Sequence, residues 1–277
     1  MTCPSTLAPD RTYRFIEVQR EGAVEWLSLN RSDNYNALNL GLTEELYDYF
    51  GSLPDRQDVR VVVLRGNGRH FCAGYELDDV KLLTVSVEQG LRMQRRLSEV
   101  IVRMRRCPQP VIGLIQGAAC GGGFALALGC DVRYAAPNAR MNVAMSKIGL
   151  TGCDMGISYF LPRAVGPAVA AELMYTGRFI DAQRALRVGL VNDVLPEEEL
   201  MDTARTLAQE MLAMSPVGLR LTKDGLAMAQ EVSSLAAVIS LEDRGQTMCF
   251  DAFMKEGVAA FREKRAPQYG STDGSKE

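Results

Sequence analysis

The chain has 277 residues, of which 47% are hydrophobic and 23% are charged, and its 31 basic and 34 acidic side chains give a net charge of −3. These values exclude a fibrous or disordered protein, and the near balance of charge predicts neither a nucleic-acid nor a membrane partner. The single histidine, His70, excludes a metal site built from several histidines of one chain, and we predict no metal. Any catalysis then depends on carboxylates, cysteine, lysine, tyrosine and backbone groups.

The cysteines and one long uncharged run bear on the compartment. Seven cysteines are an odd number without a Cys-x-x-Cys pair, and no apolar signal segment opens the sequence, so we predict a reduced, cytoplasmic protein. Residues 107–130 carry no charge over 24 positions, more than the about 20 residues that span a bilayer. Because prolines, glutamines and six glycines interrupt this run, we interpret it as a buried strand, a glycine loop and the start of a helix.

Strand and helix patterns alternate over the first part of the chain. Residues 1–12 show no periodicity and are predicted to be a flexible tail. Beta-branched and aromatic residues predict strands, and apolar residues three and four apart predict helices. The predicted strands cover 13–18, 23–29, 59–64, 111–115, 132–135 and 139–143, and the predicted helices cover 43–50, 89–106 and 124–128. This alternation predicts an α/β fold with crossover connections.

After Pro162 the pattern becomes almost entirely helical. The predicted helices cover 167–175, 181–188, 196–214, 216–229, 233–250 and 251–264, with one strand at 190–194. We therefore divide the chain into an α/β core at 13–195, a C-terminal helical region at 196–269 and a disordered tail at 270–277. The helical region is rich in alanine and methionine, which suits either an oligomer surface or a helical cap within one chain.

Two glycine-containing elements follow predicted strands. One covers residues 68–77, and the other covers 117–126 and runs into a helix. Neither has the spacing of a phosphate-binding or dinucleotide-binding loop. Glycines at a helix start let another molecule approach the backbone N–H groups and the positive end of the helix dipole. The pair could supply two donors to one developing oxyanion, whereas each run alone is also explained by close packing of a helix on a strand.

These elements, in this order, resemble the crotonase (enoyl-CoA hydratase/isomerase) superfamily from about Tyr13 to Tyr269. The matching pieces are Asn36-Ala37-Leu38-Asn39, Phe71 to Leu77, Pro110-Val111-Ile112, Gly117, Gly121 to Gly123, Cys130-Asp131, Leu161-Pro162-Arg163, Gly166, Thr176-Gly177-Arg178, Gly189-Leu190-Val191 and Phe261 to Pro267. The resemblance implies a spiral of ββα turns with a C-terminal helical trimerisation region, as homotrimers or as hexamers made of two trimers. It also implies an acyl-CoA thioester substrate, with CoA as part of the substrate and no separate cofactor.

The resemblance further implies which residues bind the substrate. The backbone N–H groups of Tyr75 and Gly122 match the family's two oxyanion-hole positions. The remaining implied substrate-binding positions are Asn36, Ala37, Leu38, Ala73, Leu77, Phe261 and Lys264, of which Phe261 and Lys264 reach the nucleotide end from a neighbouring subunit in family members. Lys264 is also explained as a solvated charge at a helix end. We interpret His70 as an exposed turn histidine without a chemical role.

The acid and base positions depart from the hydratase pattern. The two glutamates that a hydratase of this family uses fall on Ala125 and Met145, and neither side chain can move a proton. Asp154 remains, and it matches the acid of the single-aspartate phenylacetate-pathway enoyl-CoA isomerase subgroup when counted from Pro162. The alternative is that Asp154 caps the helix that holds Tyr159.

The favoured activity is therefore a double-bond shift from a 3-enoyl-CoA to a 2-enoyl-CoA, in which Asp154 takes a proton from C2 and returns it to C4. A hydratase or a CoA-thioester hydrolase is one alternative, with water positioned by Asp154 and Glu76 or Asn142. A non-catalytic acyl-CoA-binding protein is a second alternative, and a thioesterase that uses Cys153 is the weakest. No motif identifies the acyl group, whose pocket we place in the variable segment 78–99 and the C-terminal helices.

Overall fold

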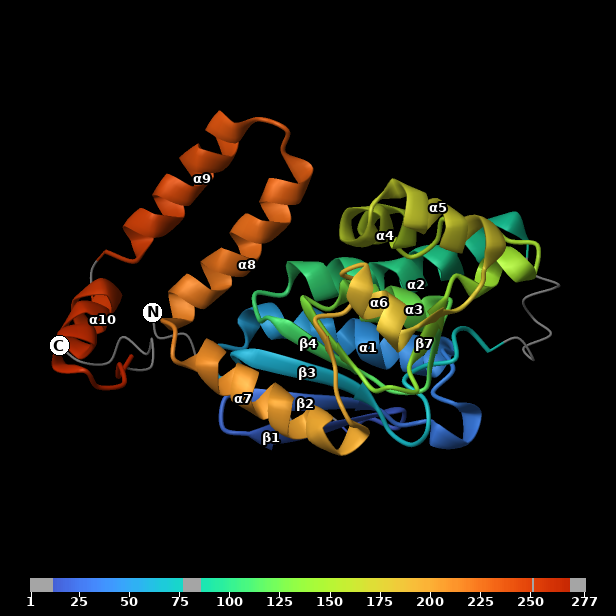
Figure 1. The fold of residues 1–277 in the computed structure, drawn as a ribbon, viewed down its shortest axis with the longest axis horizontal. Helices are drawn as coiled ribbons and strands as arrows, with labels where there is room; N and C mark the ends of the chain where they lie inside the picture. The colour runs from blue at the N-terminus through green and yellow to red at the C-terminus, as the bar shows by residue number, and fades with distance from the viewer. Residues whose placement is uncertain (1–11, 77–85, 251, 270–277) are drawn as a thin grey trace.

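The computed structural model describes residues 12–76, 86–250 and 252–269, and its strands form two sheets (Figure 1). Six strands form one sheet in the order β1-β2-β3-β4-β6-β9, and three form a second in the order β5-β7-β8. The strands are β1 (Ile16–Glu21), β2 (Val24–Leu29), β3 (Val61–Gly66), β4 (Val111–Ile115), β5 (Ala118–Cys120), β6 (Val132–Ala135), β7 (Arg140–Asn142), β8 (Ile180–Asp181) and β9 (Asp193–Val194). The predicted α/β class is confirmed.

The larger sheet begins with the predicted hairpin. Strand β1 pairs antiparallel with β2 through the turn at Gly22, which has the left-handed φ of 62° that glycine adopts without strain. Every later pair in this sheet is parallel, from β2 with β3 to β6 with β9. Strands β2 and β4 are buried at every residue, as expected for strands with both faces covered.

The chain alternates between the two sheets, and this produces the predicted spiral. After β4 in the larger sheet it adds β5 to the smaller sheet, then β6 to the larger and β7 to the smaller. Two isolated parallel bridges, Leu38 with Tyr75 and Cys72 with Ala119, continue the smaller sheet into earlier turns of the chain. The segments around Leu38 and Tyr75 are therefore held by backbone pairing, as strands are, although they lie outside the named strands.

Helices cover both faces of the larger sheet. The α-helices of the described residues are α1 (Leu40–Ser52), α2 (Val87–Arg106), α3 (Gly122–Gly129), α4 (Ile157–Val165), α5 (Pro167–Thr176), α6 (Ala182–Arg187), α7 (Leu200–Leu212), α8 (Pro216–Glu231), α9 (Leu235–Met248) and α10 (Ala252–Glu263), of which α1, α2 and α3 lie on one face of this sheet and α7 on the other. Successive residues of β3 serve two cores, since Val62 and Leu64 belong to the cluster with α1, α2 and α3, whereas Val61 and Val63 belong to the cluster with α7. The sheet therefore has one apolar layer on each face.

The structure differs from the sequence prediction mainly at short elements. The predicted glycine loop contains a three-residue strand, β5, and helix α3 begins at Gly122 rather than at 124. The strand predicted at 190–194 is reduced to Asp193–Val194, and the helix predicted from 196 opens as a 3-10 turn at Glu197–Glu199 before α7 begins. Such short pieces depend on their pairing partners rather than on a local pattern. The uncharged run 107–130 forms β4, β5 and α3, which confirms its interpretation.

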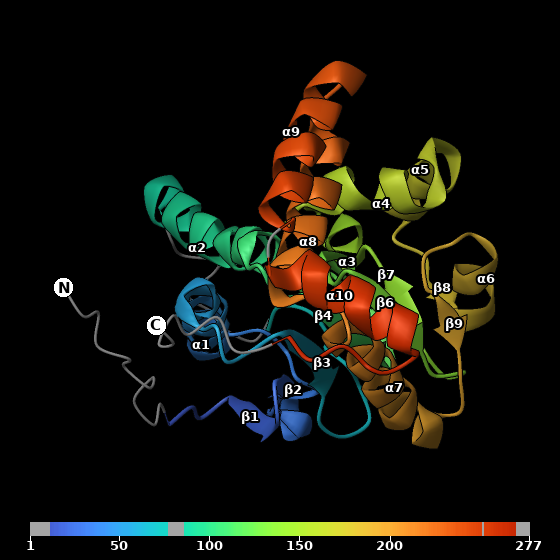
Figure 2. The ribbon, with the colours of Figure 1, turned by 90° about the vertical axis from the view of Figure 1, so that its left-hand side faces the viewer.

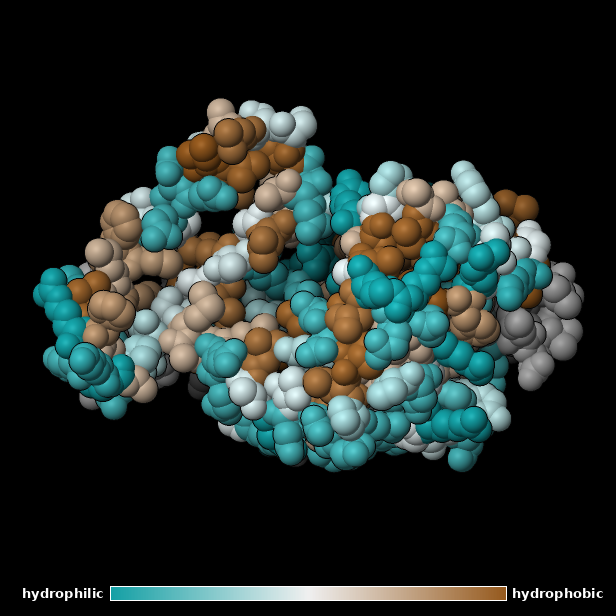
Figure 3. Space-filling view, viewed as in Figure 1, coloured by the Kyte–Doolittle hydropathy of each residue, from teal (hydrophilic) through white to brown (hydrophobic). Residues whose placement is uncertain are grey.

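The last three helices extend away from the core (Figures 1 and 2). Helix α8 is attached by Lys223, whose buried ammonium donates to the carbonyl oxygens of Met104 (3.1 Å) and Gln109 (2.8 Å) and pairs with Asp131 (3.0 Å). Helix α9 buries no residue. Hydrophobic side chains gather where α8 turns into α9 (Figure 3), and exposed ones along this region include Leu226, Leu235, Ile239, Met248, Phe250, Met254 and Phe261. Within the described ranges, no helix is both long and apolar enough to cross a membrane.

Candidate functional site

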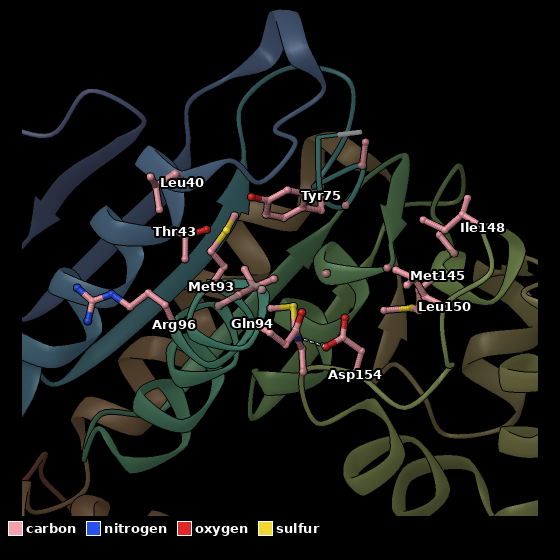
Figure 4. Close-up of a pocket in the computed structure, with 18 residues that line it drawn as sticks. Leu40, Thr43, Tyr75, Met93, Gln94, Arg96, Met145, Ile148, Leu150 and Asp154 are labelled. Carbon is pink, nitrogen blue, oxygen red and sulfur yellow. Dashed lines mark hydrogen bonds between the residues drawn. The ribbon is translucent and has the colours of Figure 1, made fainter. Parts of the chain in front are cut away.

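One cavity brings together several of the predicted site residues. It has a volume of about 230 Å³ and lies between the starts of α1 and α3, one side of α2 and the segment that precedes α4 (Figure 4). Its wall includes Ala73, Tyr75, Gly122 and Asp154 from the prediction. The other lining residues are Leu40, Thr43, Gly74, Gly90, Met93, Gln94, Arg96, Leu97, Gly121, Ala144, Met145, Ile148, Leu150 and Met155.

Each of the three glycines at the start of α3 is explained by a different structural requirement. Gly121 has a φ of 50°, and its N–H donates to the carbonyl of Asn142 (2.9 Å). A Cβ at Gly123 would collide with the carbonyl oxygen of Cys72, so this glycine serves close packing. Gly122 lines the cavity at the first helical position, where the N–H has no carbonyl of its own helix to bond and the helix dipole is positive. The backbone of Gly122 is therefore suited to meet an anionic oxygen.

Tyr75 is held in the cavity wall by backbone pairing with Leu38. The N–H of Leu38 donates to Gly74 (2.7 Å), and the N–H of Glu76 donates to Leu38 (2.9 Å). Because successive N–H groups of an extended segment point to opposite sides, the N–H of Tyr75 points away from Leu38. Gly74 has a φ of 101°, and a Cβ there would lie 2.8 Å from the carbonyl oxygen of Cys120. This close approach places the Tyr75 segment beside the start of α3.

Asp154 lies in the turn before α4 and contributes its side chain to the cavity. Its Oδ1 accepts a hydrogen bond from the amide of Gln94 on α2 (Figure 4). Burial raises the pKa of the Asp154 carboxyl above its ordinary value, and hydrogen bonds from the Met155 N–H and the Gln94 side chain oppose this rise. The alternative role as a helix cap is wrong, since α4 begins after Gly156 and has no side-chain cap.

The charged groups of the cavity wall are few. Arg96 and Asp154 are the two charged side chains among the described lining residues, and Arg96 is paired with Glu44. Ala125 is fully buried within α3, and Met145 lines the cavity. The positions predicted to match the two hydratase glutamates thus hold an alanine and a methionine, and Asp154 is the one carboxylate that the described wall presents.

The segment predicted to contact CoA is built mainly to hold a turn. Asn36 is buried, its amide donates to the carbonyls of Asn67 (2.9 Å) and His70 (2.8 Å), and its Oδ1 accepts from the Arg31 N–H. Ala37 accepts from the Arg31 side chain through its carbonyl. Leu38 is also buried, with Cδ1 2.7 Å from where a Cβ of Gly122 would stand. None of the three is among the described lining residues of the cavity. Leu77 lies outside the described residues.

The two C-terminal positions of the prediction lie far from the cavity in the single chain. Phe261 is 85% exposed near the end of α10, which lies at one end of the molecule and well away from α3 (Figure 1). Lys264 follows α10 with a left-handed φ of 52° and is exposed. One chain therefore does not bring either residue to the cavity, and their contribution from a neighbouring subunit stays a prediction.

His70 is not the exposed turn residue that the sequence suggested. It is half-buried, its Nδ1 accepts the N–H of Ala118 (3.1 Å), and its ring meets that of Tyr35 edge to face. Burial, with the nearby Arg69 and Arg140, lowers the pKa of His70. The sequence prediction failed here because nothing in a polar turn indicates that its histidine will accept a hydrogen bond from the first residue of a distant strand, here Ala118 of β5. His70 joins the loop before Phe71 to the start of β5.

The polar groups named for the alternative activities lie elsewhere. Glu76 pairs with Arg31 (2.9 Å) and accepts from Asn34, and buried Asn142 donates to the carbonyl of Gly177 (2.9 Å). Cys153 is exposed. None of these three side chains belongs to the cavity wall among the residues described.

Gln94 is the main residue of the site that the sequence analysis missed. It stands in the apolar row of α2 with Leu91, Leu97 and Ile101, within the helix predicted at 89–106. A polar amide within such a row is a signal that could have indicated a buried contact. Met155, Thr43 and Met93 were missed as well, because hydrophobic and hydroxyl residues on a helix or turn give no local sign of a cavity.

The spiral of two sheets, with a cavity between a strand-like loop and a glycine-rich helix start, defines a crotonase-fold protein. A family model described as enoyl-CoA hydratase/isomerase matches residues 19–272. A probable enoyl-CoA hydratase of Mycobacterium bovis is 37% identical, with 88% of each chain covered. The 1,2-epoxyphenylacetyl-CoA isomerase of Escherichia coli is 34% identical, covering 92% of this chain and 98% of that protein.

Solved structures agree with these sequence relatives. A putative enoyl-CoA hydratase from Streptomyces coelicolor superposes with a TM-score of 0.90 at 34% identity, covering 97% of this chain and 98% of the other. The chain belongs to the enoyl-CoA hydratase/isomerase family. Its relatives carry the names of both hydratases and isomerases, so the family alone leaves the particular reaction open.

Proposed function

We propose that the protein is an enoyl-CoA isomerase that converts a 3-enoyl-CoA to a 2-enoyl-CoA, with Asp154 as the proton carrier. The observation that carries this proposal is that Asp154 is the one carboxylate in the described cavity wall. The water-activating route of a hydratase uses two glutamates, and Ala125 and Met145 stand at those positions. One carboxylate suffices for isomerisation, because it is a base in the first step and an acid in the second.

The reaction proceeds in two proton transfers. The N–H groups of Tyr75 and Gly122 hold the thioester oxygen, and the positive end of α3 stabilises the charge that develops there. Asp154 removes a proton from C2, and the electrons of the broken C–H bond form an enolate conjugated with the double bond. The same proton then returns to C4, the double bond forms between C2 and C3, and Asp154 is again a carboxylate.

The environment of Asp154 suits this work. The raised pKa of its carboxyl makes it a stronger base than an exposed aspartate once it is ionised. Gln94 acts as a positioning residue, because its amide donates to Oδ1 and so fixes how the carboxyl is oriented in the cavity. The acid and its positioning residue come from segments 60 positions apart, on α2 and before α4.

The test is Asp154→Asn, assayed with a 3-enoyl-CoA by the rise of conjugated 2-enoyl absorbance. We expect turnover to fall by about 10²–10⁴, the range for a lost general acid/base. Since burial raises the pKa of Asp154, its ionised form destabilises the fold as the pH rises through that pKa. Asp154→Asn is therefore expected to melt no lower than the parent at neutral pH. Asp202→Asn on the exposed surface of α7 is the control, and undiminished turnover in Asp154→Asn would disprove the assignment.

The pH profile adds a second readout. The rate is expected to fall as the pH falls through the raised pKa of Asp154, because the protonated acid cannot remove a proton from C2. Gln94→Leu removes a hydrogen bond that favours the ionised form, so the pKa rises further and the acid limb moves to higher pH. A profile that does not move in Gln94→Leu would show that the amide does not act on the catalytic group.

Hydration or thioester hydrolysis is the second candidate, favoured by the hydratase names of several relatives. Asp154 would then hold a water molecule against the bound thioester. Loss of the conjugated absorbance of a 2-enoyl-CoA, with formation of the 3-hydroxy product, would favour hydration, and release of free CoA would favour hydrolysis. Binding of acyl-CoA without any turnover would instead favour a binding protein.

We also propose that copies of the chain associate as a trimer or hexamer through α9 and α10. The exposed apolar side chains of these helices support this, since such surfaces mark protein interfaces. Association would bring Phe261 and Lys264 of one copy toward the nucleotide end of a CoA bound to another.

A further inference from the structure

Thr43 presents a buried hydroxyl that has no partner within the described structure. It lies in α1, one turn after Asn39 caps the helix, and it is 3% exposed. Its Oγ1 makes no hydrogen bond with any described residue. Four other buried side-chain atoms share this property, on Trp26, Arg60, Gln109 and Asn142. Thr43 is the only one of the five whose residue lines the cavity.

The surroundings of Thr43 offer a ligand little else to bond. Leu40 and Met93, which lie beside it in the cavity wall (Figure 4), are apolar. The guanidinium of Arg96 is held by Glu44, with Nε 2.8 Å from Oε1, and stacks on the ring of Tyr47. A hydroxyl in such a place costs free energy until a partner reaches it, because it has left water without replacing its hydrogen bonds.

The position of Thr43 indicates which part of a ligand it would meet. Figure 4 shows it on α1, across the cavity from Asp154 and on the same side as Met93. The reacting carbons must lie within reach of Asp154, so a group beside Thr43 belongs to another part of the ligand. A hydroxyl can both donate and accept, which suits an alcohol, a carbonyl or an ether oxygen.

We infer that Thr43 binds an oxygen atom on the acyl part of the substrate, so that the preferred substrate is an oxygen-bearing acyl-CoA rather than a plain hydrocarbon one. This inference rests on the proposed function, since it takes an acyl-CoA as the ligand of the cavity. Sites that hydrogen-bond a substrate group discriminate strongly against analogues that lack it, because the buried partner is then left unsatisfied.

Binding of unreactive ligands tests the inference without relying on turnover. Saturated acyl-CoA thioesters of increasing length are prepared in pairs, one ending in a hydroxyl and the other in a methyl group. Their Kd values are measured by calorimetry with the parent protein, with Thr43→Val, which keeps the shape but loses the hydroxyl, and with Thr43→Ser, which keeps the hydroxyl. The matched control is Thr206→Val on α7, where the hydroxyl bonds the carbonyl of Asp202 (3.0 Å).

At the length that reaches Thr43, we expect the preference for the hydroxyl ligand to fall by about tenfold in Thr43→Val, as one hydrogen bond in a buried site requires. Thr43→Ser and Thr206→Val should keep the preference. Thr43→Val should also melt a few degrees higher without ligand, because a buried unsatisfied group is removed. A preference that is the same in the parent and in Thr43→Val at every length would overturn the inference. Failure of the parent to bind any acyl-CoA would instead overturn the proposed function, and the inference with it.

Discussion

The spiral core and the three C-terminal helices bury their hydrophobic residues in opposite ways. In the core, β2 and β4 are buried at every position, and all eight residues of α3 are buried. Helix α9 buries none of its fourteen residues, and Leu235 at its start is 74% exposed. The core therefore completes its own packing, whereas the helices beyond α7 carry apolar surface that the described residues leave uncovered.

This difference separates the parts of the site that the single chain builds from those that the proposed association of copies would add. All the described residues that line the cavity belong to the core, from the start of α1 to the turn before α4. The residues predicted for the nucleotide end of CoA lie in this exposed region, Phe261 on α10 and Lys264 directly after it. The chemistry of the site is thus expected to depend on the packing of the core. Tight binding of CoA is expected to depend on contacts between copies of the chain.

The largest expected contrast between the two regions comes from adding one methyl group to each. At Gly123 the new Cβ would collide with the Cys72 carbonyl oxygen, so Gly123→Ala is expected to lower the free energy of unfolding by roughly 3 kcal/mol or more. At Gly225 in α8 nothing lies within 4 Å, so Gly225→Ala is expected to raise it by about 0.5–1 kcal/mol. Chemical denaturation of both variants measures their free energies of unfolding. Equal changes in the two variants would contradict the difference in packing between the core and the C-terminal helices.

A smaller effect is expected at the junction of the regions. Lys223→Met removes the ammonium that holds α8 against two core carbonyls and Asp131. Removing one partner of a buried pair is strongly destabilising, but Asp131 keeps its pair with Arg105 (2.6 Å), so we expect a loss of about 2–3 kcal/mol. Cleavage by protease between α7 and α8 should become faster. The neighbouring Asp224→Asn is the control, and an unchanged cleavage rate would show that α8 is held by other contacts.

The smallest effect on the fold is expected from the uncovered helices. Leu235→Ser combined with Phe261→Ser should change the stability of the isolated chain by less than about 0.5 kcal/mol, since both side chains are exposed. The mass in solution, measured by light scattering, should fall if copies meet through α9 and α10. Val87→Ser is the control, because it makes the same kind of change at an exposed position of α2, outside the proposed interface, and should leave the mass unchanged. A mass that does not respond to the double change would contradict association through these helices.

The sequence predicted the parts of this molecule that follow local patterns. Valines and leucines at 59–64 and 111–115 indicated buried strands, and the glycines from Gly121 to Gly123 indicated a close backbone approach beside a helix start. Strand β5 was missed because its three residues owe their conformation to pairing with β7 and with Cys72. His70 was misread because its partner, the Ala118 N–H, is 48 residues away in the chain.

Within the site too, residues in local motifs could be predicted, whereas residues that depend on distant contacts could not. Tyr75, Gly122 and Asp154 could be proposed from motifs, and all three line one cavity. Gln94 and Thr43 could not be assigned, because their significance depends on which element lies opposite. Only the fold shows that the amide of Gln94 meets Asp154 and that the hydroxyl of Thr43 meets no described group.

The pairing of Leu38 with the segment around Tyr75 has a consequence for how such a protein can change its chemistry. The N–H groups that face the cavity are positioned by main-chain hydrogen bonds, which almost any side chain leaves intact. The proposed proton carrier, Asp154, is instead a side chain, and Ala125 and Met145 are side chains at the positions predicted to match the two hydratase glutamates. Substitutions at these positions can therefore exchange one reaction for another without rebuilding the frame, so a single scaffold can diversify in small mutational steps.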